Sequence, residues 1–281
     1  MKPIRYIPAG VLFIAIIASG CTFTLPEDIV DLGTQDTCPD WKTEELQVRV
    51  KEFDHRTETF TLQCALGALR NASPSPIHRT ETGARICYLL ADRTTMNQEK
   101  KERYAAEGVR WAEIALTERI EPIGAVHYYL AVNLGMAVRK HAALAVKNLK
   151  RLEEELVRAK ELSPQEEQGG PLRVLGMLYL MAPPWPKGIG DGDKALEMLE
   201  AAVRQYPDHP LNHVFYAQAL WDLEEDDAID KVKLHLKKGR EMIEKGDWGT
   251  ARERWLKEVD QIAKDAEIDL LKAEPGAGPG Q

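Results

Sequence analysis

The sequence predicts an all-α fold, and more narrowly an α-solenoid built from antiparallel helix pairs. Between Thr43 and Leu271 apolar residues recur at intervals of three and four, which is the period of an amphipathic helix. The alternation of Val and Ile that is typical of strands is missing from this stretch. Similar helix pairs also recur along it, and stacked repeats of this kind bury one continuous core.

Composition narrows the class of protein. The 281 residues include 37 Lys and Arg against 45 Asp and Glu, a formal charge of −8, and 44% of them are hydrophobic. These values are ordinary for a globular chain and disfavour global disorder or a polytopic membrane protein. The acidic balance, without a stripe of Lys and Arg, also disfavours a nucleic-acid partner, because clustered cations bind phosphates. Four Cys are too few for a disulfide-framework protein.

Residues 1–20 have the pattern of an export signal that is removed from the mature chain. Lys2 and Arg5 precede the apolar run 9–17, and the small residues 18–20 follow it. The apolar run is about half of the ~20 residues that a membrane-spanning helix needs, so a permanent anchor helix is the poorer interpretation.

The small residues directly before Cys21 resemble a bacterial lipobox. In that family the signal is cut before the Cys, whose thiol then carries a diacylglycerol and whose amine is acylated. Ala18 stands where Leu is commoner, and an ordinary signal cut near Ala18 is the alternative. Because Thr22 stands where an Asp would indicate inner-membrane retention, the resemblance implies an outer-membrane lipoprotein that faces the periplasm. Cleavage removes two basic residues and no acid, so 35 basic residues remain against 45 acidic ones, a net charge of −10.

The elements follow in order along the mature chain. Residues 21–42 contain Thr, Asp and Pro without periodicity and predict a flexible tether. Residues 43–272 form the helical repeat domain, and residues 273–281, rich in Gly and Pro, predict a disordered tail. The helices are expected at 43–53, 56–70, 79–92, 98–118, 124–138, 142–162, 171–181, 194–206, 210–223, 227–245 and 248–272.

The clearest helix pair spans residues 171–207. Small residues are expected where its two helices cross closely, large ones fill the gaps, and a Pro ends the second helix. Asp193 is the expected N-cap of that second helix. The pattern consists of Leu172, Leu175, Gly176 and Tyr179 on the first helix, and of Ala195, Leu199, Ala202 and Pro207 on the second. It resembles the tetratricopeptide (TPR) repeat, with a turn that residues 181–189 enlarge.

Partial copies of the same pattern surround this pair. Residues 124–131 with 152–164 match at most spacings, residues 210–220 match a first helix, and residues 246–255 match the start of a second. Together they predict a TPR-like α-solenoid.

A narrower resemblance rests on Gly170–Gly176, Tyr179, Ala182-Pro183 and Gly188–Asp191, together with the lipobox. This set is similar to the T-component (TatT-like) lipoproteins associated with TRAP-type transporters, over residues 79–222. The resemblance implies a lipid-anchored helical repeat protein that partners a periplasmic solute-binding protein. It brings no catalytic residues.

A partner-binding groove is expected on the first helices of the pairs, because TPR solenoids bind partners there. Helical phase places six residues in this groove, although about half of them could instead belong to the core. They are Tyr128, Val132, Arg173, Met177, Gln218 and Trp221.

Motifs with chemistry are few. His209 and His213 have metal-ligand spacing, but Pro210 lies between them, and the Asp191–Asp193 segment lacks the downstream acid of a calcium loop. No nucleophile triad or HExxH motif is present. We therefore expect no catalytic residue, metal or cofactor. The first hypothesis is a scaffold that binds an envelope protein, the second a transporter accessory subunit with a hydrophobic cavity, and the third an envelope enzyme. Homo-oligomerisation stays open.

The cysteines allow a disulfide, since exported proteins meet an oxidising compartment. Cys64 and Cys87 stand at about equal distances from the turn at 71–76 and would face each other if both point into the seam between their helices. Cys38 is the competing partner, and two buried thiols are the alternative.

Overall fold

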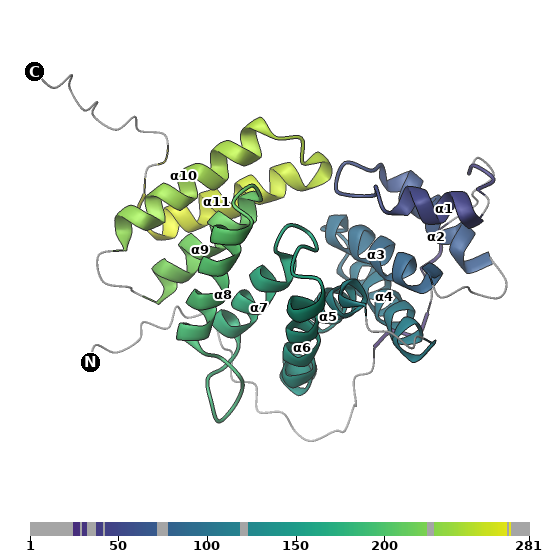
Figure 1. Ribbon diagram of the computed structural model, residues 1–281, viewed down its shortest axis with the longest axis horizontal. Helices are drawn as coiled ribbons and strands as arrows, with labels where there is room; N and C mark the ends of the chain where they lie inside the picture. The colour runs from purple at the N-terminus through teal and green to yellow at the C-terminus, as the bar shows by residue number, and fades with distance from the viewer. Residues whose placement is uncertain are drawn as a thin grey trace, which may run out of the picture.

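The computed structural model describes residues 25–28, 30–32, 38–41, 43–71, 78–118, 123–223, 228–268 and 270. Within these ranges it contains eleven α-helices, one short 3₁₀ helix and no β-strand, which confirms the all-α prediction (Figure 1). The export signal and Cys21 lie outside the described residues, as do residues 271–281.

Most helices occur where the sequence predicts them. The predicted bounds are identical to the observed ones for α4, α5 and α6. The helices are α1 (Thr43–Val50), α2 (Thr59–Asn71), α3 (His78–Arg93), α4 (Gln98–Glu118), α5 (Gly124–Val138), α6 (Ala142–Leu162), α7 (Gly170–Met181), α8 (Gly192–Gln205), α9 (Pro210–Asp222), α10 (Ile229–Lys245), the 3₁₀ helix η1 (Gly249–Ala251) and α11 (Arg252–Asp265).

The helices pack as a succession of neighbours. Most helices contact the next one along the chain, and α3, α5, α7, α9 and α11 also each contact the next of this odd-numbered set. Three clusters of buried apolar side chains follow one another: an N-terminal cluster mainly from α1–α4, a central cluster from α3–α8 and a C-terminal cluster mainly from α8–α11. No helix among the described residues is long and apolar enough to cross a bilayer.

Small residues allow the close helix crossings, as the repeat pattern requires. A Cβ added at Gly176 would lie 2.6 Å from Cγ of Leu199, so α7 and α8 can approach this closely only with Gly there. Gly239 of α10 plays the same part against α9, where an added Cβ would lie 2.7 Å from Cγ2 of Val214. The sequence pattern identified the first crossing and missed the second.

Three of the helix ends that differ from the prediction have a local reason. The helix expected at 248–272 is shorter, because Glu267 has a left-handed φ of 55° and the Ile268 amide donates back to the Ala263 carbonyl at 2.8 Å. The helix expected from residue 56 begins at Thr59, because Asp54 accepts from the Arg56 amide at 2.8 Å and forms a turn. Asp191, not Asp193, caps α8, and it accepts from the Lys194 amide.

Part of the segment predicted as a flexible tether packs on the body. Val30 is only 4% exposed. The Val30 carbonyl accepts from Arg70 Nη1 at 3.0 Å, and the Pro26 carbonyl accepts from Arg110 Nη1 at 2.7 Å. These contacts, which the tether prediction did not include, hold the segment to the body at Pro26 and Val30.

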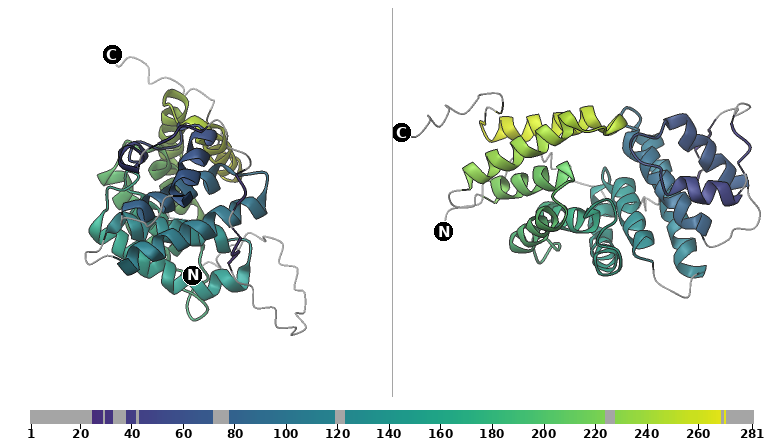
Figure 2. Two further views of the ribbon diagram at one scale, coloured as in Figure 1. Left: turned by 90° about the vertical axis from the view of Figure 1, so that its right-hand side faces the viewer. Right: turned by 45° about the horizontal axis from the view of Figure 1, so that its top comes forward.

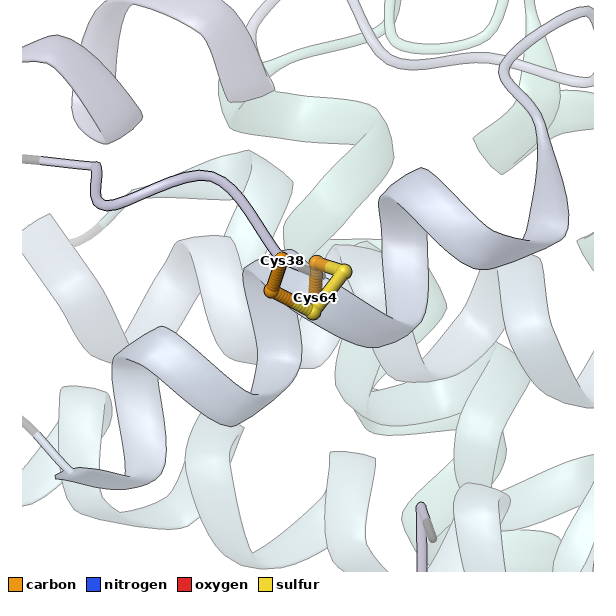
Figure 3. The surroundings of a disulfide bond; sticks show 2 residues. All are labelled: Cys38 and Cys64. Atoms are coloured by element: carbon orange, nitrogen blue, oxygen red, sulfur yellow. A yellow bond between two sulfur atoms is a disulfide. The ribbon is translucent and has the colours of Figure 1, made fainter. Parts of the chain in front are cut away.

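A disulfide joins this segment to α2, and it is not the predicted pair. Cys38 is bonded to Cys64, with Cα atoms 5.5 Å apart, while Cys87 is a free buried thiol (Figure 3). Cys87 lies in the N-terminal apolar cluster, where the charges of Glu107 and Arg110 on α4 act on it. The prediction was wrong because distance from the turn sets the height of a residue on its helix, whereas the direction of its side chain decides the bond.

The segment before α11 contacts the N-terminal part of the described chain. Figures 1 and 2 show α10 and α11 extending from the C-terminal half toward the N-terminal helices. The Thr250 amide, just before α11, donates to the His55 carbonyl at 3.0 Å. The helices are thus arranged in an arc whose ends are joined.

Candidate functional site

The structure divides the six residues predicted to line the groove. Tyr128 and Arg173 are buried, at 1% and 4% exposure, so they cannot form a contact surface, and the prediction is wrong for them. Val132, Met177, Gln218 and Trp221 are partly exposed. Val132 packs against the central cluster, while Met177 and Trp221 pack against the C-terminal one, so the four do not share one patch of core.

Arg173 is buried because it holds the turn between α6 and α7. Its Nη1 donates to Asn212 Oδ1 at 2.7 Å and to the Gln168 carbonyl at 3.5 Å, and its Nη2 donates to the Glu167 carbonyl at 3.3 Å. Asn212 Nδ2 donates to the same Gln168 carbonyl at 3.0 Å. Charged and amide donors thereby satisfy carbonyls that the turn leaves without helical partners.

These bonds stabilise an unusual backbone. Glu167 and Gln168 both have a φ of 49°, and Gly169 follows with a φ of 86°. Two non-glycine residues in the left-handed region cost on the order of 1–3 kcal/mol each, and such strain persists only where the surroundings enforce it. The enforced turn sets the position of the Glu166 and Glu167 side chains.

Those two carboxylates lie at the ring of Tyr129. The Tyr129 hydroxyl donates to Glu166 Oε1 at 2.5 Å and lies 3.5 Å from Glu167 Oε1. On the other side, Arg85 Cζ lies 5.9 Å from the centre of the Tyr129 ring, a cation–π arrangement. Tyr88 packs against the same ring, with centroids 5.8 Å apart. We call Arg85, Tyr88, Tyr129, Glu166 and Glu167 the inner cluster.

A second group of residues joins α11 to the N-terminal half. Arg254 Nη1 donates to the Asp92 carbonyl at 2.6 Å and to Asp92 Oδ1 at 2.7 Å, and its Nη2 donates to Asp92 Oδ2 at 2.5 Å. His55 Nδ1 lies 3.6 Å from Asp92 Oδ2, and the His55 ring packs edge-on against Trp255 at 5.3 Å. We call His55, Asp92, Thr250, Arg254 and Trp255 the joint.

Aromatic rings connect the inner cluster to the joint without a break. Successive ring centres are 5.2–6.4 Å apart, within the range of about 4.5–7 Å that is usual for packed aromatic pairs. The row runs from Tyr128 to Tyr129 (5.2 Å), Tyr88 (5.8 Å), His55 (6.4 Å), Trp255 (5.3 Å) and His209 (5.6 Å).

Electrostatics fix the protonation of these groups at neutral pH. Burial, together with the nearby Glu167 charge, raises the pKa of Tyr88 and Tyr129 well above its usual value, so both remain hydroxyl donors. Burial pushes the pKa of Asp92 upward, but the charge and hydrogen bonds of Arg254 outweigh it, so the pKa is lowered and the carboxylate is ionised. Tyr88, Tyr129 and Asp92 therefore each keep one protonation state near pH 7.

A separate exposed feature is the loop between α7 and α8. Trp185 is 85% exposed and Met181 is 67% exposed. The loop is nevertheless ordered by its own backbone, since the Gly190 amide donates to the Pro183 carbonyl at 2.9 Å and the Gly188 amide to the Pro184 carbonyl at 3.2 Å. The loop thus presents a large aromatic side chain on a pre-organised backbone.

The histidines discussed in the sequence take structural positions. His209 caps α9, where its Nδ1 accepts from the Leu211 amide at 3.3 Å. His213 Nδ1 lies 2.9 Å from His235 Nδ1, and its Nε2 lies 2.9 Å from the Pro207 carbonyl. Within the described ranges no group of three or more His, Cys, Asp or Glu residues could hold a metal ion.

Sequence reasoning missed most of the inner cluster and the joint. The adjacent acids Glu166 and Glu167 before Gly169-Gly170 were an available signal for a special turn. Asp92 and Arg254 carried no signal, since 162 residues separate them and neither belongs to a repeat position. No protein-family model matches the sequence, and the search of curated proteins found no match.

Proposed function

We propose that the protein is a lipid-anchored, periplasm-facing scaffold of TPR-like helix pairs that binds an envelope protein and catalyses no reaction. The lipobox ending at Cys21 supports the address. The succession of helices, in which each odd-numbered helix from α3 to α11 contacts the next, supports the relation to helical repeat proteins.

The observation that carries the binding function is the inner cluster. Four of its side chains are partly exposed: Arg85, Tyr88, Glu166 and Glu167. The turn with left-handed backbone at Glu167 and Gln168 positions the two carboxylates. Aromatic faces beside fixed charges are the side chains that contribute most to protein recognition. A periplasmic solute-binding protein is one partner of suitable location, as the transporter resemblance implies.

The lack of catalysis is supported by the pairing of the charges. Asp92 is ionised against Arg254, and Tyr129 is a bound hydroxyl beside Glu166. A general acid or base needs a pKa near the working pH and access to substrate. The pKa shifts of Asp92, Tyr88 and Tyr129 all lead away from neutrality.

The experiment has two stages. First, the lipidated chain is crosslinked in its own envelope and the bound protein is identified. The purified partner is then titrated with Arg85→Gln and Glu167→Gln, and with Arg158→Gln as the matched control, because Arg158 is 66% exposed and paired only with Glu161 among the described contacts.

We expect each inner-cluster variant to weaken binding at least about tenfold, or ~1.4 kcal/mol, and the control to leave it unchanged. Equal affinity for all four proteins, with helix content intact by circular dichroism, would exclude the inner cluster as the binding site.

A further inference from the structure

The joint is bridged by polar bonds and an aromatic contact, and neither terminal apolar cluster spans it. The C-terminal apolar cluster contains no residue from α1–α4, and the N-terminal cluster contains none from α8–α11. Contacts across the joint include the Arg254–Asp92 bonds, the Thr250 bonds to the His55 carbonyl, the packing of His55 on Trp255 and the close approach of Gly249 to the backbone of residues 55 and 56.

Part of this contact is open to solvent. The side chains of Arg254 and Asp92 keep 32% and 18% of their surfaces exposed, so water and salt reach the ion pair. Each half retains its own apolar cluster when the pair separates. Separation at the joint therefore breaks polar bonds and uncovers the part of Trp255 that packs on His55, while the terminal apolar clusters stay within their own halves. Small polar interfaces are the usual sites of relative motion within a chain.

The joint lies next to the inner cluster, so its separation would affect that cluster. The row of aromatic rings runs from Trp255 and His55 directly to Tyr88 of the inner cluster. Asp92 lies on the same helix as Tyr88 and one turn beyond it, so the joint stands next to the inner cluster.

We propose that the joint is an ionic clasp that opens reversibly and controls access of a partner to the inner cluster. This regulation rests on the proposed function, because the partner enters through the site described there. The clasp itself is a property of the chain alone and is measured without any partner.

The Thr250 amide reports directly on the clasp, because its hydrogen bond to the His55 carbonyl crosses the joint at 3.0 Å. Hydrogen exchange of this amide is compared in the full chain and in the double variant Asp92→Asn, Arg254→Gln, which removes both charges and leaves neither one unpaired. The matched control is Arg240→Gln, Asp260→Asn, which removes another ion pair of α11, the one to α10.

We expect exchange at Thr250 to be at least about tenfold faster in the joint variant, with the amides of α5 and α8 unchanged, and the control to behave as the unaltered chain. Raising the salt concentration should speed exchange at Thr250 in the unaltered chain as well. If Thr250 exchanges only as slowly as the α5 amides, or if the joint variant matches the control, the clasp is overturned.

A lock tests the regulation separately. Arg56 and Thr250 belong to segments that touch across the joint, because a Cβ added at Gly249 would lie 2.6 Å from the Arg56 Cα and the Thr250 amide donates to the His55 carbonyl. The double variant Arg56→Cys, Thr250→Cys, with its bond verified by peptide mapping, should bind the purified partner at least about tenfold more weakly when oxidised and recover on reduction. The unaltered chain receives the same reductant.

If the locked protein binds the partner with unchanged affinity, the clasp does not control access to the inner cluster. This conclusion holds even if hydrogen exchange at Thr250 shows that the clasp opens. Failure of the proposed function looks different: no envelope protein binds either the unaltered chain or the neutralised joint variant, while exchange at Thr250 still decides whether the clasp exists.

Discussion

Replacing Cys38 by Ser removes the cross-link between the N-terminal segment and α2 while leaving the core untouched. Cys64 is only 2% exposed, so altering it would also disturb packing, whereas Cys38 is partly exposed. The variant therefore isolates the effect of the bond. The hydrogen bonds from Arg70 to Val30 and from Arg110 to Pro26 remain to hold the segment.

The magnitude follows from the length of chain that the bond closes. Cys38 and Cys64 are 26 residues apart, and in the chain-entropy model a loop of this length stabilises the folded state by about 3.5 kcal/mol at 25 °C. Residual structure in the unfolded chain lowers such values, so we expect a loss of about 2–4 kcal/mol in the free energy of unfolding.

Urea unfolding of the mature chain, with and without dithiothreitol, measures this loss. Cys87→Ala is the control, because Cys87 is a free buried thiol and its variant should respond to the reductant as the unaltered chain does. Cys38→Ser should not respond at all. A Cys38→Ser protein that still loses stability on reduction would refute the reasoning, since it would contain a different disulfide.

Further substitutions test other parts of the molecule. Cys21→Ala should release the protein from membranes or leave an unprocessed precursor, as fractionation and mass spectrometry of the N-terminal peptide would show; a free thiol at Cys21 in the unaltered chain would contradict the anchor. Gly176→Val should destabilise by at least about 2 kcal/mol in thermal unfolding, because its Cβ would lie 2.6 Å from Leu199, whereas a loss below ~0.5 kcal/mol would deny the close crossing. The pKa of Asp92 is lower in the folded state than in the unfolded state, so Asp92 contributes fully to the free energy of unfolding above its unfolded pKa. This contribution is lost as the pH falls through its folded pKa, and Asp92→Asn should remove this dependence of stability on acid pH. Trp185→Ala should change stability by less than about 0.5 kcal/mol, because Trp185 is 85% exposed, and a larger loss would show that the loop supports the fold.

Local signals explain what could be predicted of the fold. The bounds of α4 and α6 were predictable because both helices have a 3.6-residue period, whereas α5 is apolar and buried on nearly all sides and was recognised as an uninterrupted apolar segment. The crossing at Gly176 was predictable because the repeat pattern specifies a small residue there. The end of α11 was not, because a Glu with a left-handed φ, Glu267, carries no sequence mark.

Contacts between distant residues explain what could not be predicted of the site. Arg173 has the helical phase of an exposed residue. It is nevertheless buried, because the turn between α6 and α7 and Asn212 of α9 cover its side chain. The joint forms only because of the curvature of the whole arc. That curvature is the sum of the small rotations between successive helix pairs, which the sequence does not show. Cys64 illustrates the same limit at short range, since its side chain turns toward residue 38 instead of toward α3.

The packed N-terminal segment sets how far the body can stand from a membrane. Arg110 holds the Pro26 carbonyl at 2.7 Å, five residues after Cys21. Five residues of fully extended chain span at most about 18 Å, so an acyl group on Cys21 would keep the body within the reach of the lipid headgroups. A body anchored in this way would stay close to the membrane, so a partner would have to bind it at the membrane surface. The position of Pro26 on the body would set which face points away from the membrane.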